Sequence, residues 1–150
     1  MYGDKGEVPE GEYIVPLGVA DMRRTGNDVT IVSFGKIIKE ADKAADELEK
    51  EGISCEIIDL RTIKPMDYEA ILTSVKKTNR LVILEEAWPF GNVATEITFH
   101  VQKHAFDYLD APIEKINTAD TPAPYSPVLL AEWLPNHQDV VNAVKKVLYK

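Results

Sequence analysis

The sequence contains a single cysteine, Cys55, which has no partner within the chain for a disulfide bond. Ile53, Ile57 and Ile58 surround it, and this pattern places the thiol in an apolar strand. A thiol buried among apolar side chains is unreactive, so we do not expect Cys55 to act as a nucleophile. A chain without disulfides is typical of a reducing compartment, and we predict a cytoplasmic location.

Basic residues are also scarce. The 17 Lys and Arg residues are outnumbered by 25 Asp and Glu residues, which gives a formal net charge of −8. Nucleic-acid surfaces need clustered Lys and Arg, so this composition argues against a nucleic-acid partner and favours basic protein partners. The sequence also lacks an apolar run long enough to span a membrane and shows no secretory signal pattern, so we predict no membrane association.

The first residues differ in composition from the rest of the chain. Residues 1–12 are rich in glycine, proline and charge and show no helical or strand period. Such a segment is typical of a linker, and we expect it to lead from an N-terminal domain that this sequence lacks. Residues 13–150 have the length and apolar content of one domain with a single sizeable core.

Short apolar or β-branched runs recur along this predicted domain, each followed by glycine, proline or a polar turn. Within residues 13–24, Pro16 and Gly18 interrupt the pattern, so any strand there is short and lies at a sheet edge. The other runs predict strands over residues 28–34, 53–60, 81–84 and 113–117.

Helical spacing appears between these runs. The alternation of strands and helices predicts a largely parallel sheet with helices on both sides, which is a three-layer α/β/α sandwich. Residues 118–127 interrupt the alternation as a proline-rich loop. The predicted helices lie between Lys36 and Gly52, after an N-cap at Asp67, over residues 92–105, and after an N-cap at Asn136.

The segment 81–97 (LVILEEAWPFGNVATEI) combines a strand, a polar turn and a helix start. Its four apolar residues predict a central strand that is covered on both faces. Glu85 and Glu86 follow at the carboxyl end of this strand, where α/β domains carry function. Paired carboxylates suit acid–base chemistry, but no histidine, serine or second cysteine lies nearby in the sequence. The residues alone therefore indicate no complete active site.

Three other groups have some potential for chemistry. The turn at residues 33–36 (SFGK) offers backbone N–H groups and a lysine to a phosphate, but it lacks the glycine spacing of nucleotide-binding motifs. Glu96, His100 and His104 are four residues apart along one predicted helix, yet their order is not that of a zinc protease motif. We therefore favour an ordinary turn and an ordinary helix face as the explanation of these two groups.

The third group is the turn at residues 59–67 (DLRTIKPMD). Asp59 and Arg61 flank the end of a predicted strand and are able to pair with each other or with a ligand at the sheet edge. The structural alternative is a turn closed by an Asp–Arg pair, with Asp67 as a helix cap. The sequence leaves the roles of Glu85, Glu86 and Arg61 open.

Several segments together resemble the C-terminal domain of pyruvate dehydrogenase beta subunits, a member of the transketolase C-terminal superfamily. The similarity follows the family order over nearly the whole chain, which short motifs rarely achieve by chance. The segments that carry it are residues 14–18 (IVPLG), 28–33 (DVTIVS), 56–63 (EIIDLRTI), 74–78 (SVKKT), 106–112 (FDYLDAP) and 119–125 (ADTPAPY).

The resemblance implies a supporting role for this domain in a larger enzyme. In the family, thiamine diphosphate and magnesium lie between the alpha subunit and the N-terminal domain of the beta subunit. The resemblance therefore implies that this domain has no catalytic, cofactor-binding or metal-binding residue of its own and binds neither group alone. The expected partners are the alpha subunit, a second beta subunit and the subunit-binding domain of the dihydrolipoyl acyltransferase core.

The resemblance also assigns residues to these contacts. The aspartate that matches Asp110 and the chain-terminal carboxylate, here on Lys150, meet basic residues of the acyltransferase in similar beta subunits. We further expect Trp88 and Pro89 to lie at a subunit interface, because an aromatic-proline turn is a rigid apolar anchor.

The turn at residues 85–89 (EEAWP) resembles that of the pyruvate enzymes, whereas branched-chain 2-oxo acid enzymes usually have His-Glu-Ala-Pro. Asn92 and Ala94 depart from the family pattern, which often has glycines there. Pyruvate is therefore the expected substrate of the whole enzyme, and a branched-chain 2-oxo acid is the alternative. A non-catalytic interaction module and a nucleotide-binding or electron-transfer domain that uses residues 33–36 are the other hypotheses.

Overall fold

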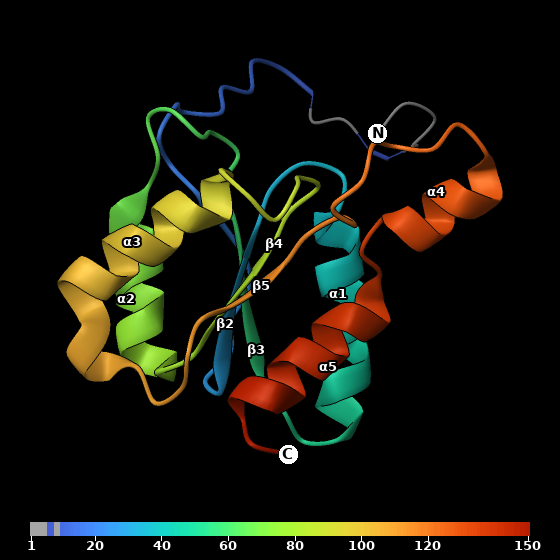
Figure 1. Cartoon of the computed structure of the whole chain (residues 1–150). Helices are drawn as coiled ribbons and strands as arrows, with labels where there is room; N and C mark the ends of the chain where they lie inside the picture. The colour runs from blue at the N-terminus through green and yellow to red at the C-terminus, as the bar shows by residue number, and fades with distance from the viewer. Residues whose placement is uncertain (1–5, 8–9) are drawn as a thin grey trace.

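The computed structural model describes residues 6–7 and 10–150 of the chain. Its middle layer is a five-stranded sheet in the order β1-β3-β2-β4-β5, and only β1 runs antiparallel to its neighbour (Figure 1). The predicted edge strand within residues 13–24 is β1, which occupies one edge of the sheet. Most of the predicted linker, residues 1–5 and 8–9, lies outside the described residues. The strands are β1 (Asp21–Arg24), β2 (Val29–Ser33), β3 (Cys55–Asp59), β4 (Leu81–Leu84) and β5 (Glu114–Ile116).

Helices cover both faces of the sheet, which confirms the predicted three-layer sandwich (Figure 1). One face packs against α1 (Ile38–Lys50) and α5 (His137–Val147), and the other face packs against α2 (Tyr68–Thr78) and α3 (Val93–Ala105). A short 3-10 turn, η1 (Phe106–Tyr108), follows α3. None of the helices among the described residues is long and apolar enough to cross a membrane.

The central strands are buried from end to end because each lies between two helical layers. Every residue of β2 and of β4 is buried. Burial of apolar side chains contributes about 1.5–3 kcal/mol for each large one, so these two strands anchor the fold. Their alternating side chains divide between two apolar clusters, one under α1 and α5 and the other under α2 and α3.

Polar side chains fix the helix starts at the predicted caps. Asn136 accepts hydrogen bonds from the N–H groups of Gln138 and Asp139, and Asp139 accepts from the N–H of Asn136. This reciprocal capping box satisfies N–H groups that have no partner within the helix. Asp67 accepts from the N–H of Ala70 and, with its other oxygen, from the N–H of Ala20, so it also ties the chain before β1 to α2.

The helix α4 (Pro127–Trp133) follows the proline-rich loop, in a region for which the sequence analysis predicted no element. Its seven residues include none that is buried, and the helix projects from the sandwich (Figure 1). Pro127 occupies the first turn, where its missing N–H costs no hydrogen bond. A helix this short, without a stripe that faces the core, leaves little periodic signal in the sequence.

Gly26 lies where the chain before β2 crosses the backbone of β3. A Cβ atom at this position would lie 2.2 Å from the carbonyl carbon of Cys55 and 2.5 Å from the nitrogen of Glu56. Only glycine allows so close an approach of two backbones. The N–H of Gly26 donates to the buried carboxylate of Glu56 at 3.3 Å, so the crossing is also a hydrogen-bonded contact.

The Glu56 carboxylate is 1% exposed and pairs with the ammonium of Lys77. Burial alone opposes its ionisation, but the hydrogen bonds from Lys77, Ser74 and Gly26 outweigh burial and hold the pKa of Glu56 below its ordinary value. At the neighbouring thiol of Cys55, burial outweighs the opposing charge of Arg24. Cys55 is 2% exposed, and burial raises the pKa of its thiol to about 12, so the predicted unreactive environment is confirmed.

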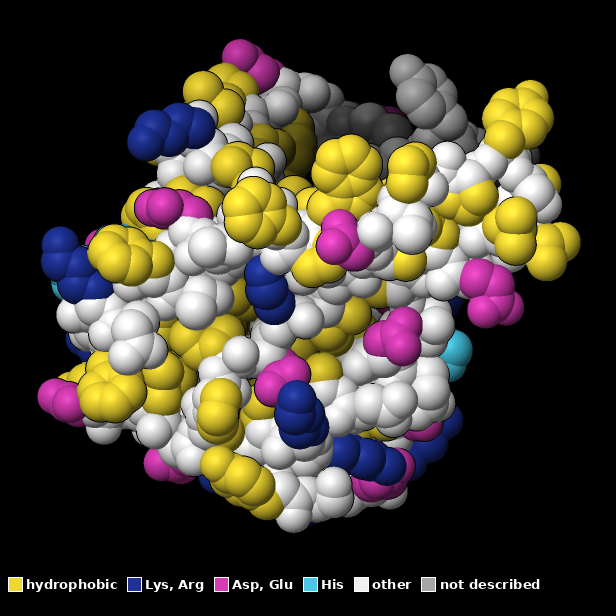
Figure 2. All heavy atoms as spheres, in the orientation of Figure 1, with side chains coloured by type: hydrophobic (Ala, Val, Ile, Leu, Met, Phe, Trp, Pro, Cys, Tyr) yellow, Lys and Arg dark blue, Asp and Glu magenta, His cyan; other side chains and the backbone are white. Residues whose placement is uncertain are grey.

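Many of the exposed apolar side chains lie where the parallel strands have their carboxyl ends. Figure 2 shows hydrophobic side chains gathered along the upper edge of the molecule, above the sheet. We call this set the carboxyl-edge surface. It consists of Tyr13, Ile14, Leu17, Trp88, Phe90, Tyr125, Val128 and Leu129, which are 56–103% exposed.

Candidate functional site

Beyond the carboxyl ends of β2 and β4, at the centre of the sheet, the chain turns in opposite directions. The chain leaves β2 through α1 and reaches β3, whereas it leaves β4 through α3 and reaches β5 on the other side. Because α1 and α3 cover opposite faces, a crevice opens above the two adjacent strands. Open α/β sheets bind ligands at such a switch point.

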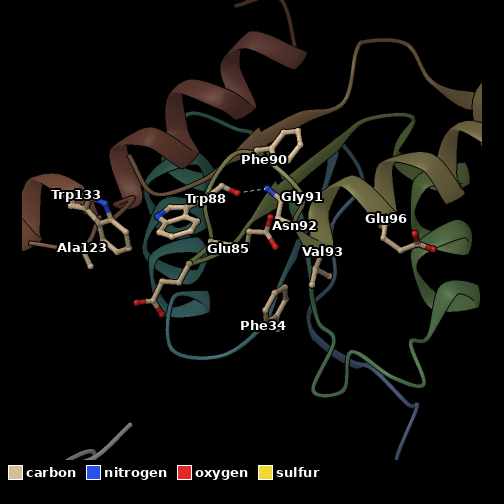
Figure 3. Close-up of a pocket in the computed structure, with 12 residues that line it drawn as sticks. Phe34, Glu85, Trp88, Phe90, Gly91, Asn92, Val93, Glu96, Ala123 and Trp133 are labelled. Carbon is tan, nitrogen blue, oxygen red and sulfur yellow. Dashed lines mark hydrogen bonds between the residues drawn. The ribbon is translucent and has the colours of Figure 1, made fainter. Parts of the chain in front are cut away.

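A crevice of about 680 Å³ occupies this position. Figure 3 shows that the side chains that line it belong to the end of β2, to the turn between β4 and α3, and to the segment around α4. This volume lies within the usual range of about 300–1,000 Å³ for ligand pockets. The residues that matter most for its chemistry are Phe34, Glu85, Trp88, Phe90, Glu96 and Trp133.

Glu85 lies at the floor of the crevice and is fully buried. Its carboxylate accepts hydrogen bonds from the N–H of Ala94 at 3.3 Å and from the amide of Asn117 at 2.9 Å. Burial raises the pKa of Glu85, and these two donors offset the rise only in part. Glu85 therefore joins the start of α3 to the segment after β5, at the expense of burying a carboxyl group.

We predict that replacing Glu85 with glutamine changes the pH dependence of stability. Because the pKa of Glu85 is raised in the folded state, its ionisation costs stability above that pKa, and the cost disappears as the pH falls. Glutamine cannot ionise. The free energy of unfolding of Glu85→Gln, relative to the native chain, should therefore rise as the pH increases above the ordinary glutamate pKa of about 4.3, and level off above the raised pKa of Glu85.

Urea unfolding at several pH values measures this difference, and Glu86→Gln is the matched control because Glu86 is exposed. The difference in the free energy of unfolding between Glu85→Gln and the native chain has a part that does not depend on pH and reflects the contacts of the new amide. Only the change of this difference with pH tests the prediction. A stability difference that does not change with pH for Glu85→Gln would contradict the raised pKa of Glu85. So would an equally strong pH dependence for Glu86→Gln.

Trp88 forms a wall of the crevice and is 56% exposed, so it does not belong to the core. Its indole N–H donates to the carbonyl of Thr121 at 3.2 Å, and the indole of Trp133 donates to the same carbonyl at 2.9 Å. The neighbouring Pro89 is half-buried, and its carbonyl accepts from the ammonium of Lys115 at 2.5 Å. Exposure of Trp88 is compatible with an interface, and that role for Trp88 and Pro89 stays a prediction.

The predicted Asp59–Arg61 group has a different arrangement from the one expected. The guanidinium of Arg61 lies 3.2 Å from the carboxylate of Asp21 in β1, whereas the carboxylate of Asp59 accepts the backbone N–H of Arg61 at 3.0 Å. The Arg61–Asp21 ion pair therefore connects the turn after β3 to the edge strand β1, and it does not close the turn itself. Asp67 is the helix cap that the structural alternative predicted.

The Glu96, His100 and His104 side chains form a cluster with Tyr68, in which Tyr68 stacks on His100 and the His104 ring is tilted against that of His100. The rings of Tyr68 and His100 are 3.8 Å apart, those of His100 and His104 are 4.5 Å apart, and the Tyr68 hydroxyl donates to Glu96 at 3.0 Å. Burial, followed by the charge of His104, lowers the pKa of His100. Across residues 6–7 and 10–150, no group of three or more His, Cys, Asp or Glu side chains is arranged to hold a metal ion.

The turn at residues 33–36 contributes Phe34 to the crevice, while Lys36 faces a separate hollow beside α1. Gly35 has a φ of +72°, which explains why this turn needs glycine. The structure thus separates the lysine from the crevice at the switch point. A phosphate site that combines the two has no support in this geometry.

Asp110 lies at the opposite end of the domain, beside the last residues of the chain. Its carboxylate is 3.3 Å from the guanidinium of Arg80 and is 57% exposed. The hydroxyl of Tyr149 donates to the carbonyl of Asp110 at 3.3 Å, so the residue before Lys150 contacts Asp110 directly. The structure thus brings the two predicted docking residues into one region, although their role in docking stays a prediction.

Comparison with known proteins adds family information to this geometry. Residues 18–140 match the model of the transketolase C-terminal domain family. The chain is 52% identical, over its whole length, to 33% of the pyruvate dehydrogenase E1 component subunit beta of Rhizobium meliloti strain 1021. Over 98% of its length it is 46% identical to 43% of the acetoin:2,6-dichlorophenolindophenol oxidoreductase subunit beta of Bacillus subtilis strain 168.

A solved structure supports the same fold. An inactive β4 tetramer of a split-gene transketolase superimposes with a TM-score of 0.80 at 28% identity, over 96% of this chain and 46% of that one. The chain thus spans between a third and a half of the length of these relatives. The similarity therefore concerns one domain of larger proteins.

Proposed function

Because this chain belongs to the transketolase C-terminal domain family, we propose that it is the C-terminal domain of the beta subunit of a thiamine diphosphate-dependent pyruvate dehydrogenase. In this role the domain supports assembly of the alpha and beta subunits and docks the acyltransferase core. The whole enzyme decarboxylates pyruvate and transfers the acetyl group to lipoyl groups, in the cytoplasm. Residues 1–12 are proposed as the linker that enters this domain, and residues 13–150 as the domain itself.

The carboxyl-edge surface is the observation that carries the assembly role. Exposed apolar groups of this size gathered on one edge mark protein interfaces. Trp88 is held in place at its backbone and at its ring, since Asn92 donates to the Trp88 carbonyl at 2.6 Å and the Thr121 carbonyl accepts from the Trp88 indole. Such rigid aromatic anchors contribute most of the binding energy at interfaces.

We place the thiamine diphosphate of the proposed enzyme outside this domain. Thiamine diphosphate requires a magnesium site for its phosphates, and the described residues offer no cluster of metal-ligating side chains. Nor does the crevice provide basic groups for a diphosphate, because none of the residues that line it is Lys, Arg or His. In the proposed enzyme, the cofactor supplies the decarboxylation chemistry from a site formed by other parts of the assembly.

A chimera tests this function. The aligned third of the Rhizobium meliloti beta subunit is replaced by these 150 residues and co-expressed with the matching alpha subunit. We expect a stable assembly that oxidises pyruvate with an artificial electron acceptor, because the identity extends across the whole chain. A chimera that folds but neither assembles nor oxidises pyruvate would contradict the proposal.

The same chimera tests the interface. Trp88→Ala with Phe90→Ala should weaken subunit assembly by about 2 kcal/mol or more, because buried aromatic anchors carry this much at interfaces. Phe99→Ala is the matched control, since Phe99 is an exposed aromatic residue on α3, outside the carboxyl-edge surface. Analytical ultracentrifugation measures the association, and equal effects of the two replacements would place the interface elsewhere.

The 46% identity to the acetoin enzyme subunit supports a second candidate substrate. An assay of the complete enzyme with pyruvate, branched-chain 2-oxo acids and acetoin, each with 2,6-dichlorophenolindophenol as acceptor, separates the candidates. We expect pyruvate to give the highest kcat/KM, in agreement with residues 85–89 and with the higher identity to the pyruvate dehydrogenase subunit.

A further inference from the structure

The crevice at the switch point combines aromatic walls with acidic groups. Trp88, Phe90, Phe34 and Trp133 supply ring surfaces, and Trp88 and Phe90 are 56% and 91% exposed. The charged residues that line it are three glutamates, Glu85, Glu86 and Glu96, with no basic residue among them. Such a lining attracts cations and repels anions.

Glu85 is the most unusual member of this group. It is fully buried, and the donors to its carboxylate include the neutral Ala94 N–H and Asn117 amide, whereas the ammonium of Lys115 acts on its pKa through charge without a hydrogen bond. Buried carboxylates are normally paired with a cation, because their desolvation is costly. Figure 3 shows the Glu85 carboxylate between Trp88, Asn92 and Val93, below the open part of the crevice.

We infer that this crevice receives an arginine side chain from a segment of a neighbouring subunit in the assembled enzyme, an inference that rests on the proposed function. A guanidinium group stacks on aromatic rings and pairs with carboxylates at the same time, so it satisfies both parts of the lining. Glu86 is exposed beside the opening and is the carboxylate that the guanidinium contacts. Glu85 lies beneath it, at the floor of the crevice.

The surroundings favour a polypeptide as the source of this cation. Trp88 and Phe90 belong both to the crevice and to the carboxyl-edge surface, so a protein that covers that surface also covers the opening. Glu96 lies at the α3 end of the crevice, and its carboxylate accepts the Tyr68 hydroxyl. The crevice, of about 680 Å³, has room for the residues that flank an arginine.

The two tryptophans of the chain provide a selective probe. Trp88 and Trp133 both line the crevice, and the sequence contains no other tryptophan. The intrinsic fluorescence of the 150-residue chain thus reports on this site. The titrant is a capped Gly-Arg-Gly peptide, and the matched titrant carries citrulline, a neutral analogue of arginine, in place of the arginine.

We expect a saturable fluorescence change with the arginine peptide and none with the citrulline peptide over the same concentrations. Glu86→Gln with Glu96→Gln should raise the Kd about tenfold, because the two replacements remove the exposed carboxylates that line the crevice. Glu47→Gln with Glu51→Gln is the matched control for the charge change, since both residues lie near the end of α1, at the opposite edge of the sheet. This control should leave the Kd unchanged.

Several results would overturn the inference. The first is binding of the citrulline peptide as tight as that of the arginine peptide, and the second is an equal effect of the two double replacements on the Kd. The third is binding of free L-arginine as tight as that of the peptide, because this result would indicate a site for a small molecule. The chimera separates this inference from the proposed function. If the chimera with Glu86→Gln and Glu96→Gln assembles normally, the arginine inference is wrong and the proposed function stands. If the unmodified chimera does not assemble, the proposed function itself is wrong.

Discussion

Replacement of Asp110 by alanine is expected to weaken docking of the acyltransferase's subunit-binding domain to the assembled enzyme by about 2–5 kcal/mol. The Asp110 carboxylate is more than half exposed and lies beside Tyr149, at the end of the chain that also carries the predicted Lys150 contact. Loss of one member of a charge pair that an interface desolvates leaves the basic partner group buried without compensation. Isothermal calorimetry with the isolated subunit-binding domain measures the change.

Asp107→Ala is the matched control, because Asp107 is an exposed aspartate in η1, three residues earlier. Decarboxylation of pyruvate with an artificial electron acceptor should stay nearly unchanged in both variants. In this structure the Asp110 carboxylate lies 3.3 Å from the guanidinium of Arg80. Intact docking together with lost decarboxylation would show that Asp110 serves catalysis or assembly instead.

Replacement of Gly26 by alanine should have the largest effect on folding, with a loss of about 3 kcal/mol or more in the free energy of unfolding. The added methyl group would lie 2.2 Å from the carbonyl carbon and 2.4 Å from the carbonyl oxygen of Cys55. These are backbone atoms of a paired central strand, which cannot rotate away as a side chain does. Relief therefore requires β2 and β3 to separate.

Gly52→Ala provides the comparison, because Gly52 has a φ of +77° and open space around its Cα. Alanine there meets only the cost of the left-handed backbone, about 1–2 kcal/mol. Urea unfolding of the two variants measures the difference. If Gly26→Ala costs no more than Gly52→Ala, the backbones at this crossing are not as close as the structure indicates.

The sequence was sufficient to predict the sheet and its covering helices because local patterns encode both. The unbroken apolar run of β4 indicated a strand buried on two faces, and the caps at Asp67 and Asn136 marked two helix starts correctly. These signals come from residues adjacent in the chain. Their interpretation needs no knowledge of distant contacts.

The contacts between distant segments were not predictable in this way. Arg61 pairs with Asp21, 40 positions earlier, and not with the nearby Asp59 that the sequence offered. Likewise, Trp88 and Trp133 converge on the Thr121 carbonyl only because the segment after β5 returns over the carboxyl edge. The position of Phe34 beside Glu85 depends on the pairing of β2 with β4. The candidate site is built from these contacts, so Glu85, Glu86 and Trp88 were visible in the sequence, whereas their convergence with Phe34, Glu96 and Trp133 was not.

Because Cys55 is buried, the chain is suited to site-directed labelling through an introduced cysteine. A thiol with a pKa of about 12 and 2% exposure stays protonated and shielded from maleimides at neutral pH, although it is the chain's sole cysteine. Any cysteine introduced on the surface is then the one reactive thiol, without prior removal of a native one. A photo-crosslinker attached through Glu86→Cys would capture the segment that covers the opening of the crevice, and mass spectrometry of the product would give the identity of that segment.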